Sequence, residues 1–595
     1  MRQPIAVALA ASLLAALPAR ADPSEQDPRE NGLLSVDELG DFERQALERA
    51  LAKRDLALVT DANGSKVRSI HIVNLDAFDV TAPVLHWLNA LRRVTREQVI
   101  ARELLVGPGE DWDDATIEET RRNIEDPKFS SLVVVQPVRP ADNPGSGDDL
   151  GDEEVDLLVV TRDVWSLRPG LSFELQQGSL SALNVSLKES NFLGRRKAAE
   201  VRYEMELGST AMGAVYEDPN IAGSRVELEA RAYSVFSRDT GELEGSRGEL
   251  RVAYPLWSLD RRWGASFSLL HDDTIARSFT GGDVRRYDAP ETPRDDALPW
   301  EYDHRQLALE SELVHSTGTR MLHRVGFGHE LEVSRPALLD SFPDDDLLRE
   351  AFTRDVLPRS ERTSAVYARY QLFEPRFAIY RDLDTFDLSE HRQVGPDLEV
   401  RVSLGGPALG SEATFLRGRA RLGMSVDVAD AIVSGSLKAD SRLQGGELID
   451  NEITAGVYAA SPRLADIVRL VGRIETMARL NETSNRFYEL GGLSGLRGYP
   501  INHYAGRRQL RVNLEARTTG IPVGPIRAGL VGFWDAGHAA DRLAELSLRH
   551  DVGAGIRFLA PQLSRALFRI DYAVPLGGPS PGFPGRITAG GAQVF

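Results

Sequence analysis

The stretch GGLSGLRGYP, residues 491–500, decides which fold this sequence predicts. It sets Arg497 among four glycines, and short segments of alternating polar and apolar residues lie on both sides of it. Alternation with a period of two is typical of a sheet that has one wet face. Taken alone, Arg-Gly-Tyr also fits an ordinary hairpin turn with an exposed arginine, so the surrounding sequence has to distinguish the two interpretations.

The alternation begins near residue 171 and continues to the end of the sequence. In AAEVRYEMELG, for example, Val201 and Tyr203 fall on one parity, whereas Arg202 and Glu204 fall on the other. A soluble antiparallel sheet gives the same pattern. Few soluble domains extend it this far without helices, however, which favours a membrane barrel.

The connections between these segments differ in length. Long acidic connections at residues 272–303 and 339–363 alternate with short turns, as they do in outer-membrane barrels. A barrel closes its sheet, so every backbone group is satisfied in lipid. At about 10 residues per spanning strand, residues 169–595 predict a transmembrane antiparallel β-barrel of about 16 strands in the bacterial outer membrane.

Composition indicates in which compartment the protein works and limits the classes of partner that it can bind. Residues 1–21 combine Arg2, an apolar run and an Ala-Arg-Ala motif, which predicts a secretory signal peptide. No later stretch is long and apolar enough for a transmembrane helix. The chain has no cysteine, so burial or a closed sheet has to replace disulfides. The formal net charge of −19 argues against nucleic acid as a partner.

A small α+β domain is predicted to precede the barrel. Residues 22–65 form a linker and a helix at 36–58, which is either packed on the next domain or a mobile segment that contacts the barrel or a partner. Residues 66–168 follow the order strand, helix, helix, strand, strand. The two helices begin after the capping residues Thr95 and Asp113.

This N-terminal region resembles a known periplasmic family. The resemblance rests on LLVGPGEDWDDATIEETRRNI (104–124), FSSLVVV (129–135) and VDLLVVTRDVWSL (155–167), which look like one polypeptide-transport-associated (POTRA) domain. It implies that residues 66–168 lie in the periplasm and receive client proteins.

The glycine-rich stretch carries a second resemblance. GGLSGLRGYP is similar to the loop motif of the superfamily that contains the BamA and TamA assembly proteins and the two-partner secretion transporters. Downstream, RRQLRVNLEART (507–518) and GLVGFWDAGH (529–538) continue the likeness, and five strands follow the loop. The resemblance implies that this is the sixth extracellular loop, folded back into the barrel with Arg497 in the lumen.

A lumenal arginine needs carboxylate partners. Its planar fork can hold two of them, and Glu515 and Asp535 are the best candidates on adjacent strands. Gly498 lets the backbone approach the barrel wall closely, and Tyr499 packs or donates a hydrogen bond nearby. We expect these residues, with Arg497, to hold the loop inside the barrel.

The first and last strands are expected to meet at a seam. Leu171 and Phe173 represent the first strand there, and Gly590, Gly591 and Phe595 the last. Because glycine weakens a strand, the resemblance implies a seam that opens laterally.

No catalytic, cofactor-binding or metal-binding motif is present in the sequence, so we expect no enzyme activity and no cofactor. The resemblance implies insertion of proteins into the outer membrane or their translocation across it. The partners would be unfolded outer-membrane or secreted clients, outer-membrane lipid, and periplasmic or lipoprotein accessory subunits. Two alternatives stay open: a two-partner secretion transporter for a dedicated exoprotein, and a passive porin-like or structural barrel.

Overall fold

A computed structural model describes most of the chain. The described residues are 36, 39–76, 94–126, 128–141, 154–176, 179–293, 295–524, 526–561, 563–577, 585–591 and 593–595. The expected signal peptide, residues 1–21, lies outside them.

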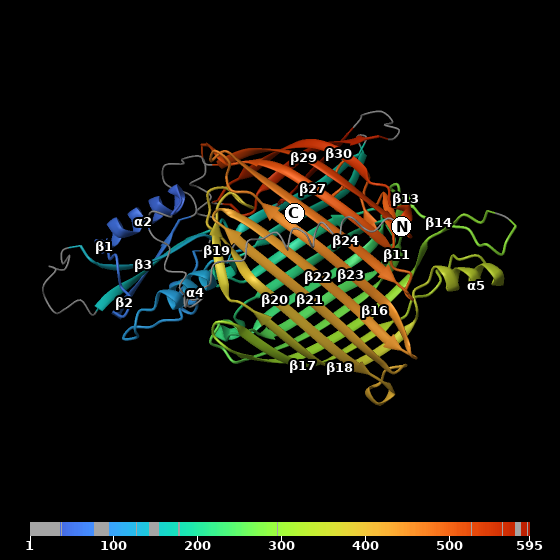
Figure 1. Cartoon of the computed structure of the whole chain (residues 1–595), viewed down its shortest axis with the longest axis horizontal. Helices are drawn as coiled ribbons and strands as arrows, with labels where there is room; N and C mark the ends of the chain where they lie inside the picture. The colour runs from blue at the N-terminus through green and yellow to red at the C-terminus, as the bar shows by residue number, and fades with distance from the viewer. Residues whose placement is uncertain are drawn as a thin grey trace.

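The N-terminal part of the structure is a four-stranded sheet with helices on both faces (Figure 1). The sheet order is β1-β3-β4-β2, in which β2 and β4 are parallel and the other pairs are antiparallel. The elements are α2 (Asp41–Arg54), β1 (Leu56–Leu58), β2 (Lys66–Leu75), α3 (Glu97–Ala101), α4 (Asp114–Ile124), β3 (Ser130–Pro140) and β4 (Glu154–Asp163). From β2 onward the element order is the expected one.

Two hydrophobic cores explain why β3 and β4 are almost continuously apolar. Leu158 and Val160 of β4 pack with α2 on one face of the sheet, and Leu157 and Val159 pack with α3 and α4 on the other. The helix expected over residues 36–58 is shorter, because Asp55 adopts a left-handed conformation with φ 54° and ends α2. Since α2 and β1 belong to this unit, the compact domain begins before the expected boundary at residue 66.

The rest of the chain closes into an antiparallel barrel. Within the described residues it has twenty strands, and two short strands, β19 (Arg376–Tyr380) and β28 (Ile521–Val523), extend single hairpins. The twenty are β5 (Leu167–Gln176), β6 (Ser179–Glu189), β7 (Ala198–Met205), β8 (Ser209–Asp218), β9 (Glu227–Ser237), β10 (Leu243–Tyr254), β11 (Trp263–Arg277), β16 (Glu301–Thr317), β17 (Leu322–Ser334), β18 (Glu361–Phe373), β20 (Glu390–Gly405), β21 (Phe415–Val428), β22 (Ala431–Gln444), β23 (Glu447–Ala460), β24 (Val468–Leu480), β27 (Arg508–Thr518), β29 (Ile526–Ala540), β30 (Arg549–Leu559), β31 (Phe568–Leu576) and β32 (Arg586–Gly591).

The expectation of about 16 strands was too low. Several hairpins connect their strands through two or three residues, such as 206–208, 429–430 and 445–446. Because these connections are short, the same length of chain holds more strands than expected. The expectation of five strands after the glycine-rich loop agrees with β27, β29, β30, β31 and β32.

The two faces of the barrel wall have opposite character. Large apolar side chains stay exposed on the outside, for example Phe327 (63%) and Leu530 (60%). The inner face carries cross-strand ion pairs, such as Arg369 with Glu312 at 2.6 Å. Among the described residues, no helix has the length and apolar character needed to cross a membrane.

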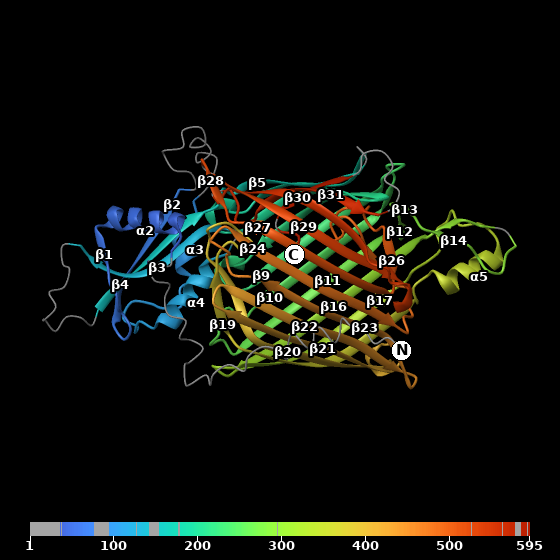
Figure 2. The same cartoon turned by 45° about the horizontal axis from the view of Figure 1, so that its top comes forward.

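The two ends of the barrel differ (Figures 1 and 2). The end away from the N-terminal domain carries the long connections 278–300, 335–360 and 481–507, the second of which contains α5 (Asp346–Asp355). The end beside the domain has shorter connections, and the exception is the sixteen-residue connection 374–389 between β18 and β20.

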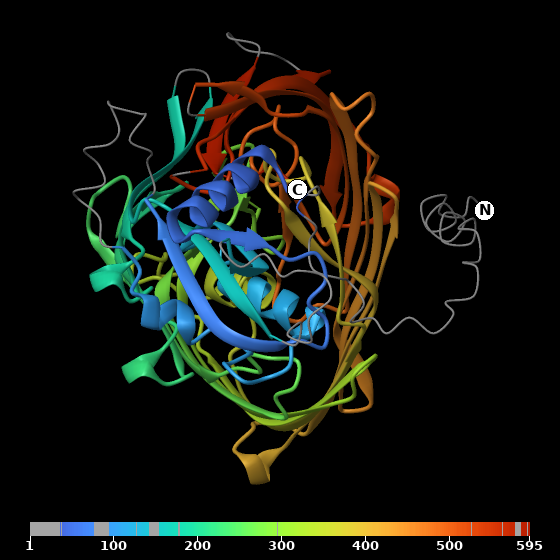
Figure 3. The same cartoon turned by 90° about the vertical axis from the view of Figure 1, so that its left-hand side faces the viewer.

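The N-terminal domain lies over one mouth of the barrel (Figure 3). Several barrel connections bind it through polar contacts. Those with side-chain partners in the domain include Arg196 to Ser130 (2.8 Å), the Leu259 amide to Glu119 (2.7 Å), Ser389 to Glu43 (3.0 Å) and Arg565 to Glu125 (2.5 Å).

An ionic cluster at this interface joins helix α4 to the barrel. Arg121 binds Glu118 of its own helix and Glu125, which caps the end of that helix, each at 2.9 Å. Across the interface, His391 lies 3.3 Å from Glu118, and Arg565 binds Glu125. Burial alone would raise the pKa of Glu118, but Arg121 and His391 outweigh it and lower that pKa to about 2.

Candidate functional site

The glycine-rich stretch folds back onto the lumenal face of the barrel, and we call residues 491–500 the latch loop. Its ends are brought together by the small hairpin of β25 (Tyr488–Leu490) and β26 (Tyr504–Gly506). Gly492 (φ +57°) and Gly495 (φ +108°) adopt conformations that L side chains rarely adopt. These glycines therefore allow the sharp bends that turn the loop inward.

Arg497 is completely buried and is bound by two carboxylates (0% exposed). Its Nε and Nη2 donate to both oxygens of Asp535 at 2.7 and 2.9 Å, and its Nη1 donates to Glu515 at 2.7 Å. The guanidinium carbon lies 3.4 Å from the ring centroid of Phe533, a cation–π contact. The structure thus brings Arg497 together with both carboxylates that were expected to bind it.

The two residues that follow Arg497 also bind the barrel wall. The Gly498 amide donates to Asp551 at 2.9 Å, and the Tyr499 hydroxyl donates to the His550 carbonyl at 3.3 Å. A Cβ at Gly498 would lie 2.5 Å from the Cβ of Asp551, so a larger residue does not fit there without displacement. Gly498 is therefore needed for the latch loop to approach the barrel wall this closely.

The carboxylates around Arg497 belong to a larger set, which we call the buried ionic cluster. Asp571 lies 3.5 Å from Arg497 and also binds Arg557 (2.5 Å) and Arg569 (2.7 Å). The members, all buried, are Arg497, Arg517, Arg557, Arg569, Glu515, Asp535, Asp551 and Asp571. Four guanidinium groups thus face four carboxyl groups, contributed by the latch loop and by β27, β29, β30 and β31.

Sequence reasoning missed half of this cluster. Asp551, Asp571, Arg557 and Arg569 lie on β30 and β31, and their side chains point to the same face as Asp535. The alternation within VGAGIRFL and LFRIDYAV already placed charges on the lumenal parity. The register that brings these strands beside the latch loop could not be predicted from the sequence.

The latch loop also touches the joint between the first and last strands. Glu174 of β5 and Arg586 of β32 form a buried ion pair across this joint. A Cβ at Gly492 would lie 2.5 Å from a carboxylate oxygen of Glu174. The loop therefore packs directly against the ion pair that joins the two ends of the barrel sheet.

The strand pairing at this joint is short. Within the described residues, which exclude 177–178, 578–584 and 592, β5 pairs with β32 along residues 173–176, whereas it pairs with β6 along its whole described length. Of the residues expected at the seam, Phe173 pairs with Ala589 across it. Leu171 lies on β5 beyond this pairing.

Three seam residues are not where they were expected. Gly590 and Gly591 pair with β31 and not with β5 in the described register. Phe595 is not at the seam at all, because residues 593–595 leave the sheet after Gly591 and enter the lumen, where the Phe595 carbonyl accepts a hydrogen bond from Arg517. The alternation of the last residues had predicted a strand up to Phe595, and tertiary contacts override it.

Comparisons with known proteins concern the fold. No family model matches the chain, and no curated protein matches it. Similar solved structures include CdiB from Escherichia coli, at 10% identity over 97% of this chain and 93% of that chain, with a TM-score of 0.40. CdiB from Acinetobacter baumannii is 10% identical over 92% and 79%, with a TM-score of 0.36. BamA from Haemophilus ducreyi lacking POTRA domains 1–3 is 12% identical over 89% and 85%, with a TM-score of 0.33.

By its own geometry the chain is a large closed antiparallel β-barrel with an α+β domain over one mouth. A buried arginine holds an inward-folded loop beside a short strand joint.

Proposed function

We propose that this chain is a bacterial outer-membrane protein of the BamA/TamA type, which inserts client proteins into that membrane or moves them across it. The observation that carries the proposal is the joint between β5 and β32, whose described residues pair over 173–176 on β5. A passive pore needs no weak joint, because continuous pairing gives a more stable wall. A short joint is suited to opening sideways toward lipid.

The outer surface supports a place in the outer membrane. Its exposed apolar side chains, including Leu313, Phe327 and Leu530, form the kind of surface that lipid covers in transmembrane barrels. The N-terminal domain would then lie on the periplasmic side, and α5 on the cell surface.

The N-terminal domain supports a role in receiving clients. We assign it to the POTRA family on its sequence motifs and its element order. In the described residues β2 is at the edge of the sheet. Its start already pairs with residues 109–111 through Lys66 and Val67, so the proposed place for an extended segment is along residues 69–73. Strand addition of this kind recognises unfolded chains through their backbone, largely independently of sequence.

The latch loop is proposed to control the joint. Arg497 fixes the loop to β27 and β29, and Gly492 places the same loop against Glu174 at the joint. Opening the joint separates Glu174 from Arg586, so the loop has to release or follow one of them. The role assigned to these residues is positional, and the proposal includes no catalysis and no cofactor.

Depletion of the protein, followed by proteomics of the outer membrane, tests the proposal. Loss of many different barrel proteins is the expected result. Loss of one exoprotein alone would instead indicate a dedicated two-partner secretion transporter. An unchanged proteome, together with steady single-channel conductance of the purified protein, would indicate a passive barrel and contradict the proposal.

A further inference from the structure

Residues 593–595 lie inside the barrel. β32 ends at Gly591, and Phe595 lies against β27, which is separated from β32 by β29, β30 and β31 in the sheet order. The three whole-chain views place this end of the chain within the outline of the barrel (Figures 1, 2 and 3). The segment therefore crosses the lumen rather than extending the last strand.

Two arginines of the buried ionic cluster hold this segment. Arg517 donates from Nη2 to the Phe595 carbonyl at 3.0 Å, and its guanidinium lies 5.3 Å from the centroid of the Phe595 ring. Arg557 donates from Nε to the side-chain oxygen of Gln593 at 2.9 Å. Each arginine is fixed in turn by a carboxylate, Arg517 by Glu515 and Arg557 by Asp571. The two arginines are thus preorganised donors, one aimed at a backbone oxygen and the other at a side-chain amide.

The ring of Phe595 rests on an apolar surface. It packs, together with Tyr458, against a buried cluster that combines the wall of the barrel with the connection 374–389. The buried members of that cluster are Tyr380, Leu383, Val394, Ile432, Ala460 and Val471. An aromatic side chain is thus accommodated at the mouth that the N-terminal domain covers.

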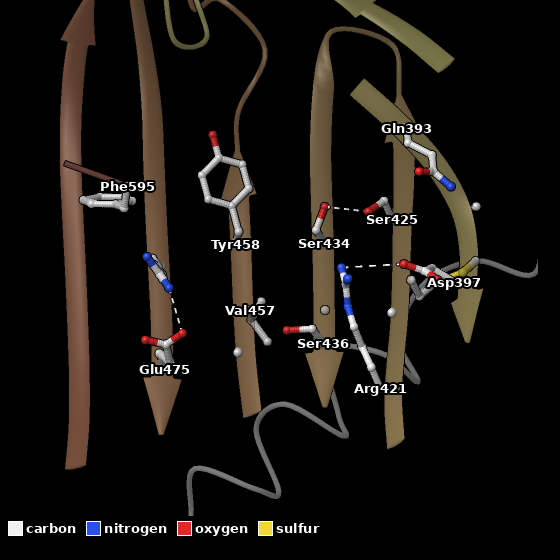
Figure 4. Close-up of a pocket in the computed structure, with 16 residues that line it drawn as sticks. Gln393, Asp397, Arg421, Ser425, Ser434, Ser436, Val457, Tyr458, Glu475 and Phe595 are labelled. Atoms are coloured by element: carbon white, nitrogen blue, oxygen red, sulfur yellow. Dashed lines mark hydrogen bonds and ion pairs between the residues drawn. The ribbon is translucent and has the colours of Figure 1, made fainter. Parts of the chain in front are cut away.

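A cavity of about 380 Å³ extends from Phe595 along the inner wall (Figure 4). Its lining combines apolar groups, such as Met424 and Val457, with the polar side chains of Arg421, Ser434, Ser436 and Tyr458. The Tyr458 hydroxyl is buried and has no hydrogen-bond partner among the described residues. A ligand-sized space with an unsatisfied polar group is typical of a binding site, and Phe595 is part of its lining.

We propose that this cavity and the two arginines form a lumenal binding site for an extended peptide segment that carries an aromatic side chain. Residues 593–595 of this chain occupy the site in the structure. The aromatic ring is held by Arg517 and the apolar surface, and the cavity beside it accommodates further atoms of the bound segment. That a client segment replaces the chain's own segment during transport rests on the proposed function, whereas the existence of the site does not.

Peptide binding to the purified full-length protein in detergent micelles tests the site. The probe is a fluorescein-labelled peptide with the sequence of residues 589–595, AGGAQVF, and the control probe has alanine in place of its phenylalanine. We expect deletion of residues 593–595, or Phe595→Ala, to raise the affinity for the first probe at least tenfold. Adding Ser434→Trp, which fills the cavity, should abolish that gain.

The site is refuted if both probes bind the deletion variant equally, or if wild type binds as tightly as the two variants. Phe595→Ala retains the chain length, so it answers the question if the deletion variant does not fold. Failure here is distinguishable from failure of the proposed function: a client-assembly defect on depletion with no peptide binding removes only the lumenal site. Peptide binding without any depletion phenotype removes only the assembly role.

Discussion

Arg497 neutralises a carboxylate-rich pocket that has no access to water. Because both carboxylates are fully buried beside it, removal of the guanidinium leaves Asp535 without its ion-pair partner, whereas Glu515 keeps Arg517. Breaking a buried ion pair in this way costs about 3–5 kcal/mol. We expect Arg497→Ala to lower the free energy of unfolding by that amount in urea titrations of the purified barrel. Client assembly should fall even in cells with the wild-type amount of protein at the surface.

Arg231→Ala is the matched control for this substitution. Arg231 is also on the barrel wall and paired with a glutamate, but its side chain is 44% exposed. Such pairs contribute about 1 kcal/mol or less. Equal effects of the two substitutions would contradict the role given to the buried cluster, and full client assembly by a folded Arg497→Ala protein would contradict the latch.

Gly492 is predicted to couple the latch loop to the joint. Gly492→Ala and Gly524→Ala share the cost of a left-handed backbone, about 1–2 kcal/mol, since φ is +57° and +61°. Only at Gly492 does the new Cβ meet another residue, Glu174. Overpacking adds about 1–3 kcal/mol. Thermal denaturation should therefore show a larger loss for Gly492→Ala, and equal losses would mean that the contact is unimportant.

For individual residues, the sequence predicted those contacts that follow from side-chain chemistry. An arginine in a lumen requires carboxylates, and this requirement with strand parity led to Glu515 and Asp535. It could not lead to Glu174 or Arg586, because the contact of Gly492 with the first strand depends on barrel closure between residues more than 300 positions apart.

At the scale of strands, the joint between β5 and β32 is the element on which the proposed function depends. Phe173 and Ala589 are opposite each other there, and directly opposite residues have Cβ atoms close enough for a disulfide after small adjustment. The chain has no native cysteine to interfere. We expect Phe173→Cys with Ala589→Cys to crosslink under oxidising conditions and to stop client assembly, which reducing agent restores.

A crosslink within the first hairpin is the control. Phe173→Cys with Leu183→Cys joins β5 to β6, which stay paired in the proposed mechanism. This crosslink should leave client assembly unchanged. If closure of the β5–β32 joint had no effect either, lateral opening would not be part of the mechanism.

Strands were predictable as a class, but their number was not. Alternation identifies a two-faced strand wherever it occurs, as in β7 and β9. It does not tell whether two residues such as 445–446 are a complete turn or part of a longer connection. The end of β32 failed for a different reason, since Arg517 and Arg557 draw residues 593–595 away from the sheet.

For the molecule as a whole, the docked N-terminal domain closes one mouth of the barrel through an interface that contains Glu118. The pKa of this group is depressed to about 2 from an ordinary 4.5. Arg121 lies on the same helix as Glu118 and lowers this pKa whether or not the domain is docked, whereas His391 acts across the interface. The part of the shift that His391 causes stabilises the docked form at pH values above 4.5, and this stabilisation is lost as the pH falls from 4.5 toward 2.

Distances between spin labels on Asp61 of the domain and Arg320 of the barrel report this release, because both positions are exposed. We expect the distance distribution to broaden as the pH is lowered through this window. Glu118→Gln should reduce the pH dependence and weaken docking at neutral pH. A distribution that does not change with pH in wild type would exclude Glu118 as a determinant of docking.

The contact between Gly492 and Glu174 has a consequence for biogenesis. The latch loop binds carboxylates on β27, β29 and β31 and also packs against the first strand, so its final position is available only after both ends of the sheet have met. A nascent barrel that is still open lacks the complete binding surface for the latch loop. Protease protection of this loop in pulse-labelled cells should therefore appear when the barrel closes. It distinguishes closed barrels from barrels whose strands have formed but whose first and last strands have not yet paired.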